Sequence, residues 1–270
     1  MTISPEVLGN NAAGRLYAIL SAAKVQLVHP NPNAAASAGW LRAAGLPGNE
    51  NEVESARLAA ELITAIAREI PAVLEATKAA GIPEGLIGPQ VHHLGNSLHV
   101  HLLNAQGSQS AQYITGEALL ALGWASVVLP NEDVVVEDAA VAELTQKIDE
   151  LRQALEVEGI PPSLRRYADQ QLESLNRALR MFRVQGAAPF RSAVRKAVSD
   201  AHFDEEEIKA ALDTHAESPP VRTLREKLGG ALKSAAAVAG EAEKFTKAAI
   251  YLGNQAKDGA TLLIDAVSKL

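Results

Sequence analysis

Apolar residues recur at steps of three and four along most of this chain, which is the spacing of an amphipathic α-helix. The clearest example covers residues 52–80, where Gly81 and Pro83 then end the helix. The apolar face of this predicted helix consists of Ala56, Ile63, Ile66, Ile70, Val73 and Thr77. Weaker patterns predict a first helix over 5–28, a short helix around Trp40, and a helix over 110–124.

The second half of the chain carries two matched apolar rows, separated by Gly159 and two prolines at 161 and 162. The first row is Val141, Leu144, Ile148, Leu151 and Leu155, and the second is Ala168, Leu172, Leu175, Leu179 and Phe182. Two such rows on either side of a helix-breaking turn predict an antiparallel helical hairpin. A short helix over 190–199 and one or two long helices after Pro220 are expected to follow.

Residues 125–137 depart from the helical pattern. Two runs of valine flank Pro130 and Asn131, and such runs around a turn are typical of a small β-hairpin. Two strands alone are only marginally stable, so an extended linker between the halves is the alternative. The sequence therefore predicts an all-α, multi-helix bundle, with an N-terminal helical bundle over 1–130 and a coiled-coil-like C-terminal bundle over 131–270.

Composition agrees with helices, because aromatics make up only 4% of a chain that is 47% hydrophobic, and alanine and leucine outnumber the β-branched residues. The net charge of −7 argues against general DNA binding, since affinity for phosphates comes from lysine and arginine. The chain has no cysteine, which excludes disulfides and thiolate metal sites. With neither a signal-peptide pattern nor an apolar run long enough to span a bilayer, the expected location is the cytoplasm.

Four of the seven histidines, His92, His93, His99 and His101, lie within ten residues of one another. They belong to a run from Gly85 to Gly116 that contains no Asp, Glu, Lys or Arg. In a chain that is 21% charged, such a run is expected to be buried, covered by a partner, or lining a cavity. It is the first candidate site, for a ligand or for pH sensing.

Three geometries give the histidine cluster a function. A strand would place His99 and His101 on one face, in the H-x-H arrangement of many metal sites. A helix would instead align His92 with His99, and a buried cluster would respond to pH. The alternative is that the imidazoles are hydrogen-bonded within a helical bundle, and no metal or other cofactor is assigned.

The second candidate site is a basic stripe on the second helix of the predicted hairpin. On a helical wheel its arginines lie opposite the apolar row; they are Arg165, Arg166, Arg177, Arg180 and Arg183. The stretch 164–196 holds eight basic and two acidic residues, which suits an acidic partner, RNA or a membrane surface. The alternative is pairing within the chain, with Glu150, Glu156, Glu158 or the acidic run 204–207.

Two further patterns bear on function. Arg195 and His202 are six residues apart, a spacing similar to the R-x4–6-H signature of the helical HEPN ribonucleases, although about one such pair is expected by chance. Small residues recur near heptad spacing after Pro220, which would allow close packing within the protein, with another copy, or as a membrane-lying hairpin.

The sequence matches none of the phosphate-binding, nucleophile-elbow or zinc-protease motifs. The layout resembles that of many bacterial helical proteins, which implies no activity. We therefore expect a non-enzymatic scaffold or regulatory protein that binds a protein partner or forms a homo-oligomer. The alternatives are a membrane-active effector making peripheral contact through its C-terminal helices, and an enzyme with a histidine-based metal site or a HEPN-like ribonuclease centre.

Overall fold

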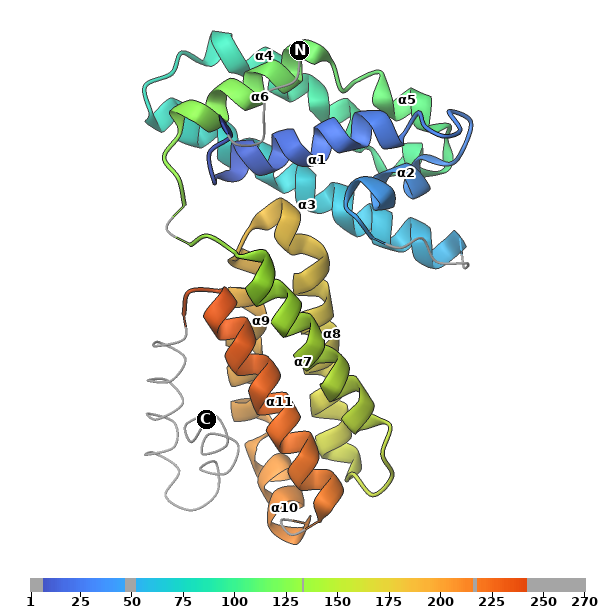
Figure 1. The fold of residues 1–270 in the computed structure, drawn as a ribbon, viewed down its shortest axis with the longest axis vertical. Helices are drawn as coiled ribbons and strands as arrows, with labels where there is room; N and C mark the ends of the chain where they lie inside the picture. Colours follow the sequence, from blue (N-terminus) through green and yellow to red (C-terminus); the bar gives the residue numbers. More distant parts are fainter. Residues whose placement is uncertain (1–6, 47–51, 133, 216–217, 242–270) are drawn as a thin grey trace. The chain divides into compact units, whose positions relative to one another are not determined.

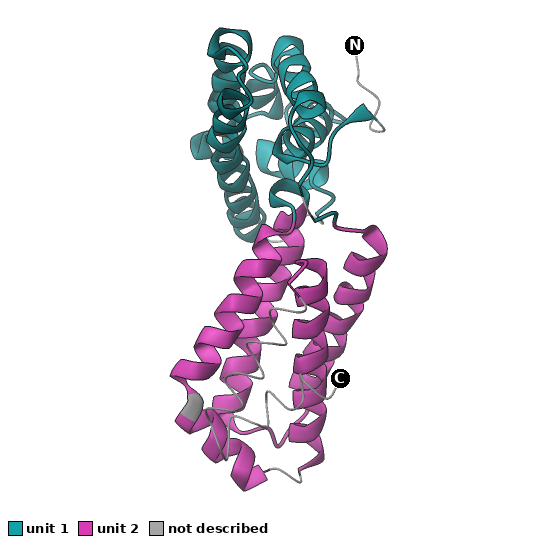
Figure 2. Ribbon diagram, turned by 90° about the vertical axis from the view of Figure 1, so that its left-hand side faces the viewer, with its two compact units in different colours: residues 1–135, 183–186 teal, residues 136–182, 187–270 magenta. Residues whose placement is uncertain are grey.

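The computed structural model describes residues 7–46, 52–132, 134–215 and 218–241. These residues form an all-α protein in which 11 α-helices are present and no strand is found, so the predicted fold class is confirmed. Contacts between Cα atoms divide the chain into two compact units, shown in Figure 2. Unit 1 comprises residues 1–135 and 183–186, and unit 2 comprises 136–182 and 187–270.

Unit 1 contains the first six helices and two short 3-10 turns (Figure 1). In chain order they are α1 (Ala12–Gln26), α2 (Ala36–Ala43), α3 (Glu52–Ala79), α4 (Glu84–Leu94), η2 (Gly95–Leu98), η3 (Val100–Asn104), α5 (Gly107–Ala111) and α6 (Gly116–Val128). The long helix predicted from 52 is confirmed, and Gly81 after it takes the left-handed φ of +77° that glycine adopts at low cost.

The core of unit 1 forms where α1 packs on α2, α3 and α6, and where α4 packs on α3 and α6. Among its fully buried side chains are Leu16, Leu20, Trp40, Leu62, Ile63, Ile66 and Leu122. Asn11 connects two of these helices, because its side chain accepts the Gly14 amide proton to cap α1 while its amide donates to the carbonyls of Ser126 (2.9 Å) and Leu129 (3.2 Å). Gly107 allows another close approach, since a Cβ there would lie 2.0 Å from the Leu27 carbonyl oxygen.

The β-hairpin prediction for 125–137 is wrong. Ala125 to Val128 are the last turn of α6, and the described residues after them have no regular structure. Helix α6 continues through Val127 and Val128 because the residues before them pack in the core. Leu122, Ala125 and Ser126 are all fully buried. This packing outweighs the local preference of the two β-branched valines for a strand. The linker alternative fits the irregular residues 129–132 and 134–137.

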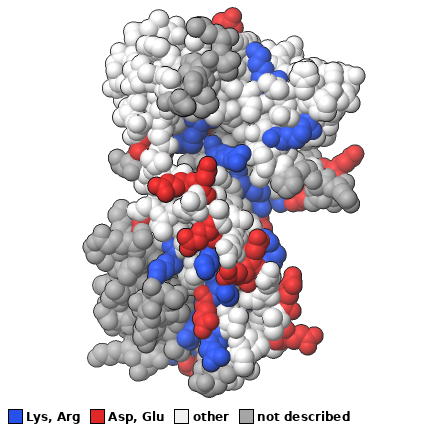
Figure 3. All heavy atoms as spheres, viewed as in Figure 1, with Lys and Arg blue, Asp and Glu red and all other residues white. Residues whose placement is uncertain are grey.

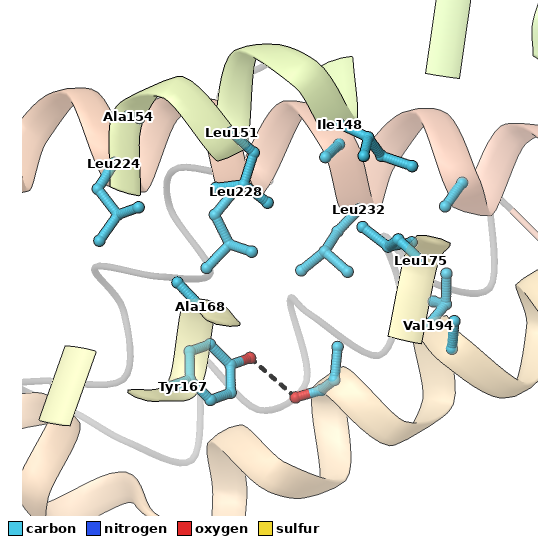
Figure 4. Close-up of a cluster of buried hydrophobic side chains, with 14 of the residues drawn as sticks. Ile148, Leu151, Ala154, Tyr167, Ala168, Leu175, Val194, Leu224, Leu228 and Leu232 are labelled. Atoms are coloured by element: carbon cyan, nitrogen blue, oxygen red, sulfur yellow. Dashed lines mark hydrogen bonds between the residues drawn. The ribbon is translucent and has the colours of Figure 1, made fainter. Parts of the chain in front are cut away.

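Unit 2 is built from α7 (Asp138–Leu155), α8 (Pro162–Gln185) up to Phe182, α9 (Ala188–Phe203), α10 (Glu205–His215) and α11 (Pro219–Val238). Helices α7 and α8 are the predicted hairpin, and Gly159 in its turn has a φ of +87°. Apart from Val141, the residues of both predicted apolar rows belong to or pack on one buried cluster, in which Leu151 lies beside Leu228 and Leu175 lies near Leu232 (Figure 4). Tyr167 is buried in this cluster, and its hydroxyl donates to the Ala197 carbonyl at 2.9 Å.

The small residues after Pro220 pack within unit 2 as far as the structure describes them. Helix α11 lies against α7 and α9, and its buried small residues are Gly229, Ala231, Ala235 and Ala236. The remainder of the alanine pattern, from Ala242 to Ala256, lies outside the described residues. For α11, packing within the protein therefore accounts for the pattern.

Candidate functional site

The histidine cluster lies on the surface of unit 1. His92 and His93 are in the last turn of α4, His99 separates η2 from η3, and His101 lies in η3; all four are exposed. The rings of His99 and His101 stack with centroids 5.3 Å apart, while His93 contacts the edge of Tyr113 at 5.6 Å. Of the four histidines, these ring contacts bring together His99 and His101, whereas His93 contacts a tyrosine and His92 takes part in neither contact.

None of the geometries proposed for the histidines is formed. Residues 98–102 are 3-10 turns, so the strand that would align His99 and His101 is absent from this segment, and α4 ends at Leu94, so no helix aligns His92 with His99. Over the described part of the chain, no three His, Asp or Glu side chains are grouped so that they could hold a metal ion. The four histidines are exposed, so the buried cluster that the sequence suggested is not formed, and a ligand-binding or pH-sensing role for these residues stays a prediction.

The uncharged character of this region extends further than its histidines. From Gly85 to Asn131 the chain contains one charged residue, Glu117. Glu117 is in the first turn of α6, where hydrogen bonds from its own backbone amide and from Thr115 lower the pKa of its carboxyl. The negative charge of Glu117 therefore stabilises the N-terminal end of α6, where a carboxylate interacts favourably with the helix dipole.

Helix α6 leaves a row of large apolar side chains in water. Leu120 is 53% exposed, Trp124 46%, Val127 54% and Val128 44%. We call these four residues the α6 face. The opposite side of the helix is occupied, because α1 and α4 both pack on α6, and Leu122 is fully buried.

The surface around the α6 face is also poor in charge. In the space-filling view of Figure 3, unit 1 shows mostly uncharged atoms, in contrast to the mixed red and blue of unit 2. Helix α1, which packs on α6, has exposed Ala18 and Val25. Its Lys24 lies near enough to α6 to help lower the pKa of Glu117, whereas the four residues of the α6 face carry no charge.

Sequence reasoning missed the α6 face. The pattern predicted a helix ending at Trp124 and placed both valines in a small β-hairpin or an extended linker, which separated residues that α6 holds on one side. The available signal was that the segment from Leu119 to Val128 is apolar at almost every position, which is typical of a helix covered on all sides. Here one of those sides has no cover within the described chain.

The basic stripe lies on the outer side of α8, opposite buried Ala168 and Leu175, as the helical wheel predicts. Several of its arginines contact groups of the same chain. Arg165 donates to the carbonyls of Leu155 and Val157 at the end of α7, and Arg183 donates to the Ala44 carbonyl at 3.5 Å within unit 1. The guanidinium groups of Arg165 and Arg183 therefore donate hydrogen bonds to backbone carbonyl oxygens of the same chain.

The remaining arginines of the stripe include two with carboxylate partners. Arg166 pairs with Glu207 at 2.7 Å, Arg180 pairs with Glu173 at 2.8 Å, and Arg177 is exposed with interactions of its own. Glu207 belongs to the acidic run that the sequence proposed as an internal partner. These contacts support pairing within the chain, and binding of an acidic partner by the stripe stays a prediction.

Arg195 and His202, the pair with ribonuclease-like spacing, both lie on α9. Arg195 pairs with Glu241 at 2.7 Å, and the His202 ring lies 6.1 Å from the ring of Phe203. Each therefore has its own neighbours within unit 2.

An ionic cluster in unit 1 involves Arg15 of α1. Its guanidinium lies 2.7 Å from the Glu132 carboxylate and 3.6 Å from that of Glu69, and it donates to the Val184 carbonyl at 3.0 Å. Burial raises the pKa of Glu69 above its usual value, although Arg15 and a hydrogen bond from Gln185 favour the charged form. Arg15 of α1 thus contacts Val184, and Glu69 of α3 accepts a hydrogen bond from Gln185. These contacts agree with the assignment of residues 183–186, which include the end of α8, to unit 1.

Comparison with known proteins adds no functional information, because no family model, curated protein or solved structure matches the chain. Among the helices that the structure describes, none has both the length and the apolar character needed to cross a membrane.

Proposed function

We propose that this protein is a non-enzymatic interaction protein and that the α6 face is its binding surface. The observation that carries the proposal is the exposure of four large apolar side chains on one side of one helix, with only Glu117 as a charged residue from Gly85 to Asn131. Single exposed apolar residues are ordinary on protein surfaces, whereas a contiguous apolar patch marks a site that another surface covers.

The composition of the α6 face suits binding to protein. Tryptophan is enriched at the energetic centres of interfaces, and Trp124 lies between Leu120 and Val127 along the helix. Leucine, valine and tryptophan contribute contact area and exclude water, and their side chains have no group that transfers protons. These properties support recognition of a partner as the role of this surface.

A lipid surface fits the α6 face less well than a protein does. Helices that lie in a membrane interface combine an apolar side with lysines and arginines that contact anionic headgroups. Helix α6 has neither lysine nor arginine, and its charged residue is the acidic Glu117. Helix α6 itself therefore supplies no electrostatic attraction to anionic lipid, and the neighbouring cation Lys24 of α1 acts on Glu117.

Site-specific photo-cross-linking tests this proposal. A photoreactive amino acid replaces Val127 in the full chain expressed in cells, and the matched control replaces Phe203, which is 82% exposed on α9 in unit 2. We expect light-dependent adducts from position 127 at much higher yield than from position 203, with mass spectrometry to identify the attached protein. Equal yields at the two positions, or no adduct from position 127, would contradict the proposal.

A further inference from the structure

The spacing of the α6 face specifies the shape of the surface that covers it. Leu120, Trp124 and Val127 follow one another at steps of four and three, and Val128 completes the last turn. This is the spacing with which one helix presents side chains to another helix packed at a shallow angle. The natural complement is therefore a second helix that exposes the same pattern.

Within the described chain, that pattern occurs once. The other large apolar side chains that are exposed are single residues on their helices or loops, such as Val25 on α1, Leu86 on α4 and Phe203 on α9. A matching row is thus available on α6 of another molecule of the same protein. We propose that a second copy of this chain covers the α6 face, with the two α6 helices packed against each other about a two-fold axis. This inference rests on the proposed function, because it names the partner of the same surface.

The charge distribution favours a second copy. A two-fold contact places each patch against an identical patch, so any charge within it would meet a like charge. The four residues of the α6 face are uncharged; Glu117 is at the first turn of α6, and Lys24 of α1 is near enough to help lower the pKa of its carboxyl. An antiparallel pairing with its axis near Trp124 puts the two Glu117 carboxylates at opposite ends of the contact, and Leu120 of each copy near Val127 of the other.

The size of the α6 face predicts a weak dimer. The exposed parts of four side chains cover well under the roughly 800 Å² that each partner buries in a standard interface. Other groups around α6 must contribute further contact area. We expect an equilibrium between monomer and dimer that shifts with concentration and depends only weakly on salt, since the four side chains of the α6 face are uncharged.

Charge substitution on the α6 face tests the inference. The acidic variant carries Leu120→Glu with Val127→Glu, and the basic variant carries Leu120→Lys with Val127→Lys. Both positions are more than half exposed and both new residues favour helices, so the variants should keep the circular dichroism of the unaltered protein. The matched control is Phe203→Glu, which adds a charge at an exposed apolar position outside unit 1.

Sedimentation velocity over a concentration series gives the outcome. We expect the unaltered protein and Phe203→Glu to self-associate alike, and each charged variant alone to associate at least about tenfold more weakly because like charges meet in the contact. Mixing the acidic and basic variants should restore association, because opposite charges then face each other. Restoration by mixing is a result that a folding defect does not produce.

Failure of this inference can be distinguished from failure of the proposed function. If the unaltered protein is monomeric at every concentration, or if the acidic variant associates as the unaltered protein does, the second copy is overturned as the occupant. Cross-linking from position 127 to a different protein in that case leaves the interaction function in place. The absence of both self-association and cross-links overturns the two proposals together.

Discussion

Trp124 and Leu122 are two residues apart on α6, and their side chains have opposite surroundings: Leu122 is fully buried, whereas Trp124 is 46% exposed. The helix thus separates a side that holds unit 1 together from a side that is available to a partner. This division predicts which substitutions affect the stability of unit 1 and which affect its binding.

Substitutions on the two sides of α6 should differ in their effect on stability. Leu122→Ala leaves a cavity in the core and is expected to lower the free energy of unfolding by about 2–5 kcal/mol. Trp124→Ala should cost about 1 kcal/mol or less, because much of that side chain is already in contact with water. Urea unfolding at low protein concentration, where α6 is free of partners, provides the comparison. Equal losses for the two variants would mean that the Trp124 side chain supports the core.

The cluster around Arg15 should give substitutions of opposite sign. Arg15→Met leaves the carboxylates of Glu69 and Glu132 without their cation and is expected to destabilise the protein by roughly 2–4 kcal/mol. Glu69→Gln should be neutral or stabilising at neutral pH, because burial raises the pKa of Glu69 and makes its charged form costly. Chemical unfolding at pH 7 measures both effects.

The pH dependence of the Glu69 effect follows from the direction of its pKa shift. A carboxyl whose pKa is raised in the folded state binds a proton more tightly there than in the unfolded chain. The stability of the unaltered protein relative to Glu69→Gln should therefore increase as the pH falls from neutral towards the unfolded value of about 4.3. A relative stability that decreases over this range would show that the Arg15 ion pair outweighs burial.

Tyr167 tests the core of unit 2. Its buried hydroxyl donates to the Ala197 carbonyl on α9, and burial, reinforced by Asp200 and Asp204, raises the pKa of the phenol. Tyr167→Phe removes this hydrogen bond with little change of volume, so we expect a loss of about 1 kcal/mol in the free energy of unfolding. An unchanged free energy would indicate that the Ala197 carbonyl finds another donor.

The basic stripe makes a separate prediction. Arg166 and Glu207 are 60% and 62% exposed, so their ion pair should contribute less than about 1 kcal/mol. A double-mutant cycle with Arg166→Gln and Glu207→Gln measures the coupling between them, and this coupling should decrease further at high salt. A coupling well above that limit would assign the pair a structural role.

Sequence patterns predicted the elements in which periodicity and stop signals agree. Helix α3 and the hairpin of α7 and α8 each combine an apolar row with a glycine at the end, and both formed as predicted. The end of α6 was predicted incorrectly because Val127 and Val128 favour strands locally, whereas burial of Ala125 and Ser126 keeps the chain helical. Local preference gave the wrong structure where tertiary packing decided it.

The α6 face was not among the sites predicted from the sequence. The charge-free run that contains the histidines ends at Gly116, before Leu120, Trp124, Val127 and Val128. Which residues are exposed depends on α1 and α4 packing against α6, and contacts between helices distant in sequence are not visible in a local pattern. The α6 face was therefore found from the structure.

The fluorescence of Trp124 measures directly whether a partner covers the α6 face. The protein has two tryptophans, of which Trp40 is fully buried and Trp124 is 46% exposed. Acrylamide quenching of the unaltered protein is compared with that of Trp124→Phe, in which Trp40 alone emits, over a series of protein concentrations. We expect the Trp124 contribution to be strongly quenched in dilute protein and to become protected as the concentration rises, while Trp40 stays protected throughout. Quenching of Trp124 that stays the same from dilute to concentrated protein, and in the presence of any protein cross-linked from position 127, would show that no partner covers the α6 face.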